Sequence, residues 1–158
     1  MKYLFLLAIT IAIVGIPARA QSTEDSVRAA VGAIFTAMKN ADPIQIRDAF
    51  TDSAILQSVS TDPMGKTSVR TTSISQFMER ISSLGKDAAD ERVHIDWVKV
   101  DGPLAMVWAP YSFYLKGKFS HCGIDTFQLI RTAKGWKIQY IIYTGRANAC
   151  PLGAPGAP

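Results

Sequence analysis

The chain has 158 residues, of which 48% are hydrophobic and 19% charged, with 17 Lys and Arg against 13 Asp and Glu. This length predicts one domain, and the composition excludes a disordered protein because the apolar residues suffice for a core. The formal charge of +4 falls to +2 without Lys2 and Arg19, which belong to the N-terminal segment described next. Since the remaining basic residues are scattered, the sequence predicts no nucleic-acid partner.

Residues 1–20 have the pattern of a secretory signal peptide. Lys2 supplies the positive charge, residues 4–14 form an apolar run, and Ala18-Arg19-Ala20 is typical of a cleavage site. We therefore expect cleavage after Ala20 and a secreted or periplasmic protein with no stable membrane span afterwards. An uncleaved anchor is the alternative, although the apolar run is short for a spanning helix.

Two cysteines, Cys122 and Cys150, remain in the part expected to be exported. An oxidising compartment and an even count favour a disulfide between them, and two buried thiols are the alternative. A disulfide closing this loop of 28 residues would add about 3–4 kcal/mol of stability. With two histidines and no ligand spacing typical of zinc, the sequence predicts no metal site and no cofactor.

A helical half of the chain precedes a strand half, which predicts an α+β domain over residues 21–150. Three helices are expected, each from a capping residue followed by apolar residues three and four positions apart. They begin at Ser22 or Thr23, at Asp42-Pro43 and at Ser73. Strands are expected over 54–59, 67–70, 91–100, 104–115, 119–131 and 136–144. Residues 151–158, rich in Pro, Gly and Ala, are expected to be a flexible tail.

The turns between the last four expected strands determine which side chains share a face of the sheet. One face is strongly apolar and should meet the helices. Its members are Ile95, Trp97, Val107, Ala109, Tyr111, Phe113, Phe127, Leu129, Trp136, Ile138, Tyr140 and Ile142, together with His121 and Asp125. The opposite face mixes polar groups with Trp108, Ile124 and Tyr143, which suits a dimer interface. The alternation slips by one at Trp97-Val98, which indicates a bulge.

Three stretches resemble the nuclear transport factor 2-like superfamily, namely Asp48-Ala49-Phe50-Thr51-Asp52, Phe119 to Phe127, and Gly135-Trp136-Lys137-Ile138. The resemblance covers roughly residues 25–146 and is nearest to secreted bacterial members grouped with lumazine-binding and SnoaL-like proteins. It implies a cone in which three N-terminal helices pack on a curved, mainly antiparallel sheet around a pocket, often in homodimers. The superfamily includes ketosteroid isomerase, scytalone dehydratase and polyketide cyclases, which place an Asp, His or Tyr in that pocket. No set of residues here matches one of those enzymes one for one, so the resemblance assigns no catalytic role.

Asp125 is the best candidate for a catalytic residue. A carboxylate facing Ala109 and an aromatic lining would be desolvated, which raises its pKa and suits a general base or a proton donor. An Asp neutralised by Arg47 or Arg70 is the alternative. His121 lies four residues away, about 13 Å along a strand, so a His–Asp dyad is not expected. The histidine is then either a ligand contact or a structural residue.

The sequence leads to three hypotheses. The first is an exported domain that binds a small apolar or aromatic molecule through Tyr111, Phe113, His121, Asp125, Tyr140 and Trp97. The second is an isomerase or dehydratase in which Asp125 moves a proton. The third is a non-catalytic module that forms a homodimer through Trp108, Ile124 and Tyr143.

Overall fold

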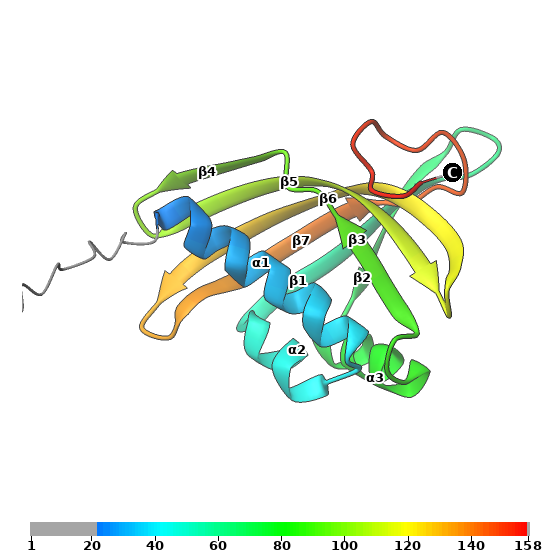
Figure 1. Ribbon diagram of the computed structural model, residues 1–158. Coiled ribbons are helices and arrows are strands. Elements are labelled where there is room, and N and C mark those ends of the chain that lie inside the picture. The colour runs from blue at the N-terminus through cyan, green and yellow to red at the C-terminus, as the bar shows by residue number, and fades with distance from the viewer. Residues whose placement is uncertain (1–21, 158) are drawn as a thin grey trace, which may run out of the picture.

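The computed structural model describes residues 22–157 and shows three helices on one side of a strongly curved sheet (Figure 1). The helices are α1 (Thr23–Lys39), α2 (Pro43–Ala49) and α3 (Ile74–Leu84). This arrangement confirms the predicted α+β cone. The expected signal peptide, residues 1–20, lies outside the described residues. None of the described helices has the length and apolar character needed to cross a membrane.

The helices begin at the predicted capping residues. The Ser22 side chain accepts a hydrogen bond from the Asp25 backbone, and the Asp25 carboxylate accepts one from the Ser22 backbone. Ser73 and Gln76 form the same reciprocal pair at the start of α3, which ends at Gly85 with φ of 84°. Each pair satisfies two backbone N–H groups that a helix start leaves without partners, which explains why local sequence was sufficient to locate these helices.

Seven strands form one sheet in the order β2-β1-β7-β6-β5-β3, with β4 also paired to β5. They are β1 (Phe50–Thr61), β2 (Thr67–Thr72), β3 (Ala89–Val93), β4 (Trp97–Asp101), β5 (Leu104–Leu115), β6 (Lys118–Thr132) and β7 (Gly135–Thr144). Strands β1 and β7 run parallel and the other pairs are antiparallel. The sheet is therefore mainly antiparallel, as expected.

The strand expected over 91–100 is divided into β3 and β4. The pairing with β5 changes by one residue between them, because Val93 lies opposite Tyr111 whereas Trp97 lies opposite Trp108. Val98 is therefore buried in the core at 3% exposure, and Trp97 faces outward. The predicted inner position of Trp97 is wrong, although the alternation does slip in this segment.

A bulge in β7 changes the inner face again. Ile138 lies opposite Leu129, but the next pair joins Tyr140 to Gln128, so Gln139 is an extra residue in β7. Beyond this point the inward and outward positions exchange, and Ile141 faces the helices. The predicted inner positions of Tyr140 and Ile142 are wrong for this reason.

The core lies between the helices and the inner face of the sheet. Val31 and Ile34 of α1 pack there with Val107, Leu129 and Ile138 of β5, β6 and β7, and each is at most 2% exposed. Burying a side chain of this size contributes about 1.5–3 kcal/mol. Away from these residues, toward α3 and the start of β6, the same layer is hollow.

The C-terminal segment lies against the outer face of the sheet. A disulfide joins Cys122 of β6 to Cys150, which confirms the predicted pairing. Beyond it, Gly153 approaches Pro110 of β5, and the Tyr114 hydroxyl donates a hydrogen bond to the Gly156 carbonyl.

Candidate functional site

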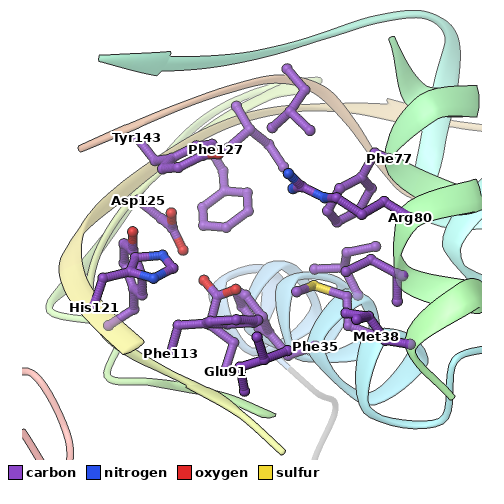
Figure 2. A pocket seen from close by; sticks show the side chains of 17 residues that line it. Phe35, Met38, Phe77, Arg80, Glu91, Phe113, His121, Asp125, Phe127 and Tyr143 are labelled. Atoms are coloured by element: carbon purple, nitrogen blue, oxygen red, sulfur yellow. The ribbon is translucent and has the colours of Figure 1, made fainter. Parts of the chain in front are cut away.

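A cavity of about 310 Å³ lies between α1, α3 and the inner face of the sheet (Figure 2). Its wall is mostly apolar and aromatic, and each element around it contributes a large side chain. These include Phe35 of α1, Phe77 of α3, Phe113 of β5, Phe127 of β6 and Tyr143 of β7. The volume is at the lower end of the range typical of small-molecule sites.

Four of the six expected ligand contacts, Tyr111, Phe113, His121 and Asp125, line the cavity. The other two do not. Trp97 stacks on Trp108 at the outer face, with ring centres 6.5 Å apart. The Tyr140 hydroxyl donates a hydrogen bond of 2.6 Å to the side-chain carbonyl of Gln57.

The residues expected to form a dimer face are also divided. Trp108 lies on the outer face and is 38% exposed, and Ile124, opposite Pro110, alternates with the inward-facing Asp125. Tyr143 instead lines the cavity directly opposite Asp125, so its predicted outward position is wrong. The β7 bulge accounts for this reversal as it does for Tyr140.

Asp125 occupies the middle of β6 and is 4% exposed. It lies opposite Ala109, as expected, and its carboxyl group points into the cavity (Figure 2). The alternative of neutralisation by an arginine is not what the structure shows. Arg47 pairs with Asp52, and within residues 22–157 no Lys or Arg lies within 4.0 Å of Asp125.

The neighbour of Asp125 is a second acid, Glu91 of β3, which the sequence analysis missed. Glu91 lies opposite Phe113, and its carboxyl group and that of Asp125 point into the same part of the cavity (Figure 2). The signal was present in the sequence, because counting back from the inward Ile95 in steps of two passes Val93 and reaches Glu91.

Burial sets the protonation of this acid pair. It raises the pKa of Glu91 to about 7, against the opposing effect of the hydrogen bond from Asp125. Burial also raises the pKa of Asp125 well above its usual range, and repulsion and hydrogen bonding from Glu91 raise it further. Near neutral pH, Asp125 therefore holds a proton and Glu91 is close to its midpoint.

Two polar neighbours of the acid pair are engaged with other groups. The Tyr111 hydroxyl donates a hydrogen bond of 2.9 Å to the Thr144 carbonyl. Burial and the charges of Asp125 and Glu91 raise the Tyr111 pKa, so the hydroxyl stays protonated. Nδ1 of His121 lies 3.0 Å from the Ser120 hydroxyl, and burial followed by the charge of Arg80 lowers the pKa of this histidine.

Arg80 of α3 is exposed and lines the cavity on the side away from the two acids (Figure 2). The site thus combines an apolar body, a carboxyl pair with one firmly held proton, a neutral histidine and one cation next to solvent. Among the described residues, no three His, Cys, Asp or Glu side chains gather closely enough to bind a metal ion.

A family model described as "Putative lumazine-binding" matches residues 22–144. Solved structures with the same fold include nuclear transport factor 2-like proteins of unknown function from Methylobacillus flagellatus and Silicibacter pomeroyi. The first is 16% identical with a TM-score of 0.61, over 84% of this chain and 99% of that one. The second is 19% identical with a TM-score of 0.60, over 77% and 93%.

A ketosteroid isomerase-like protein from Erwinia carotovora atroseptica is 21% identical with a TM-score of 0.54, over 76% of this chain and 93% of that one. At these identities the structures show a shared fold and no more. No curated protein sequence matches the chain.

Proposed function

The chain belongs to the putative lumazine-binding family of the nuclear transport factor 2-like superfamily, and from this premise we propose that it is an exported protein that binds a small aromatic molecule. The observation that carries the proposal is the aromatic-lined cavity of about 310 Å³ with two acids in its wall. The signal-peptide pattern and the Cys122–Cys150 disulfide support export. The N-terminus of the protein recovered outside the cytoplasm should then be Gln21.

The cavity wall favours a flat, largely apolar ligand. Phe35, Phe113 and Phe127 present ring surfaces, and buried contact with such rings contributes most of the affinity in sites of this kind. The polar groups on the wall are few, so they would orient the ligand more than hold it.

Binding can be tested with two bicyclic probes, lumazine, which the family description suggests, and 2-naphthylmethanol. We expect saturable binding of at least one of them by isothermal titration calorimetry. Leu84→Trp should weaken that binding at least tenfold, because Leu84 lines the cavity and a larger side chain would fill it. Leu104→Trp makes the same change on the outer face, where Leu104 is 43% exposed, and should leave binding unchanged. The proposal is wrong if neither probe binds or if Leu84→Trp has no effect.

The acid pair supports catalysis as a second candidate function. Ionised Glu91 could remove a proton from carbon next to a carbonyl group, while protonated Asp125 donates a hydrogen bond to the carbonyl oxygen as negative charge develops there. An isomerase or a dehydratase would use this step.

Proton removal can be measured without knowing the substrate. The bicyclic ketone 2-tetralone exchanges the hydrogens beside its carbonyl for deuterium in D₂O, and NMR follows the rate. A catalytic pair should accelerate the exchange in the wild type and lose that effect in Glu91→Gln and in Asp125→Asn. Equal rates in wild type, both variants and buffer would exclude this function for 2-tetralone-like ketones.

We further propose a homodimer formed through the outer face of the sheet. Trp97, Trp108 and Met106 are each 38–42% exposed there, and surface aromatic residues are typical of protein interfaces. Light scattering should show a dimer for the wild type and a monomer for Trp108→Arg. Ile44→Arg, at a 73% exposed site on α2, is the matched control and should stay dimeric. A monomeric wild type would refute this part of the proposal.

A further inference from the structure

The two acids in the cavity wall have no positively charged partner. Lys39 of α1 and Arg92 of β3 both form ion pairs with Asp90, at 3.1 and 3.0 Å. Asp90 adjoins Glu91 in sequence and therefore points to the opposite side of β3. Lys39 and Arg92 are thus paired with Asp90 outside the cavity. Glu91 and Asp125 have no basic side chain as an ion-pair partner among the described residues.

The remaining ionisable groups around the cavity do not neutralise the pair. Burial and the charge of Arg80 lower the pKa of His121, so its ring is neutral at pH 7. Arg80 extends from α3, on the far side of the cavity, and lies beyond 4.0 Å from either acid. The hydroxyl of Tyr111 is committed to the Thr144 carbonyl.

Aromatic rings flank the unpaired acids. Phe113 lies directly opposite Glu91 on the neighbouring strand, and Tyr143 lies directly opposite Asp125. An aromatic face attracts a cation, and a buried carboxylate is costly unless a positive charge pairs with it. The two acids and the two rings therefore all favour a positively charged ligand group at this end of the cavity.

We propose that the ligand carries a basic nitrogen, as a protonated amine or amidine, on its apolar body, and that this cation binds between Glu91 and Asp125. The inference rests on the proposed binding function and names the ligand class of that site. When the cation binds, Glu91 becomes fully ionised and the proton that it loses passes to the solvent. The aromatic body of the ligand then occupies the apolar remainder of the cavity.

A matched pair of probes tests the charge alone. 2-Naphthylmethylamine and 2-naphthylmethanol share one ring system and one linker, and they differ in an ammonium group against a hydroxyl group. In titration calorimetry on the mature chain, the amine should bind at least tenfold more tightly at about pH 8. The advantage should shrink toward about pH 6, where Glu91 holds its proton. Near pH 7, where Glu91 still holds part of its proton, titrations in two buffers of different ionisation enthalpy should show proton release for the amine and none for the alcohol.

Three variants assign the preference to Glu91. Glu91→Gln keeps the side-chain shape but removes the carboxylate that pairs with the cation, so it should reduce the preference for the amine to about twofold or less while the alcohol binds as before. Asp125→Asn replaces a protonated carboxyl group with a neutral amide and should keep most of the preference. Asp90→Asn removes the neighbouring acid that faces away from the cavity and should keep the full preference.

The outcomes separate this inference from the proposed function. Equal binding of amine and alcohol, or an amine preference that survives Glu91→Gln, would refute the cationic ligand and leave an aromatic-binding protein. If neither probe binds, the proposed binding function fails and the inference fails with it.

Discussion

Gly123 allows two strands to approach each other beside the cavity. A Cβ atom at this position would lie 1.8 Å from the Thr144 carbonyl oxygen and 2.9 Å from the Tyr111 ring. That carbonyl oxygen is also the acceptor for the Tyr111 hydroxyl. A side chain at 123 would therefore displace backbone, not the end of a flexible side chain, and would disturb the hydrogen bond that fixes Tyr111.

Gly123→Ala should consequently lower the free energy of unfolding by about 2–4 kcal/mol, as measured by urea denaturation. Gly32→Ala is the matched control, because Gly32 is an exposed position within α1 where a Cβ atom meets nothing within 4 Å. That change should stabilise the protein by up to about 1 kcal/mol, since alanine favours helix. A loss below about 0.5 kcal/mol in Gly123→Ala would show that the strands separate without cost.

Single residues of the cavity were predictable where the pairing of adjacent strands is regular. The hairpin of β5 and β6 correctly placed Asp125 opposite Ala109, and Tyr111 and Phe113 on the inner face. Glu91 was missed from the sequence because β3 pairs with the edge of β5 that lies away from β6, and a break at residues 94–96 separates β3 from β4. Its role depends on proximity to Asp125, which is 34 positions away and which no local pattern reports.

At the scale of elements, helices were easier to predict than the faces of strands. A helix start is fixed by groups three residues apart, such as Ser73 and Gln76, so its signal is local. The inner face of β7 depends on the bulge at Gln139, whose side chain hydrogen-bonds with Thr51 and Ser53 of β1. Those partners are more than 80 positions distant, so the sequence alone did not show that the alternation changes there.

The disulfide joins the C-terminal segment to the strand that carries part of the cavity wall. Cys122, which lies between His121 and Gly123 in β6, is fully buried. Its backbone N–H donates a hydrogen bond of 2.9 Å to the Arg146 carbonyl, and its carbonyl accepts one of 2.9 Å from the Arg146 N–H. The bond therefore anchors both residues 151–157 and the start of β6. It is an element-scale constraint that adds to the hydrogen bonds of the sheet.

Removing this bond with Cys150→Ser should lower the free energy of unfolding by about 3–4 kcal/mol, because the unfolded chain regains the freedom of a 28-residue loop. Urea denaturation measures the loss, and limited proteolysis should cleave the segment after Arg146 sooner than in the wild type. Under reducing conditions the wild type should behave like the variant. Equal stability of oxidised and reduced wild type would contradict a stabilising disulfide.

At the scale of the whole molecule, the cavity and its acid pair reduce the stability of the folded domain. A filled core at this end of the cone would bury more apolar surface, and two adjacent carboxyl groups in the cavity wall oppose folding whenever both lose their protons. The folded state therefore prefers the protonated pair. This preference links the stability of the entire domain to pH through two side chains.

The sign of that linkage follows from the raised pKa of Glu91. The folded protein holds this proton more tightly than the unfolded chain, so the stabilisation is complete below about pH 4.5 and is lost as pH rises through about 7. The lowered pKa of His121 has the opposite effect, because below its ordinary pKa this histidine destabilises the folded state as pH falls. We therefore compare the free energy of unfolding of the wild type with that of Glu91→Gln, since the His121 contribution is common to both. In urea denaturation this difference should change by roughly 3 kcal/mol between those pH values, with the wild type relatively weaker at the higher pH. Glu79→Gln, at an exposed site on α3, is the control for losing one negative charge. A pH-independent difference for Glu91→Gln would mean that solvent, not the cavity, surrounds this carboxyl group.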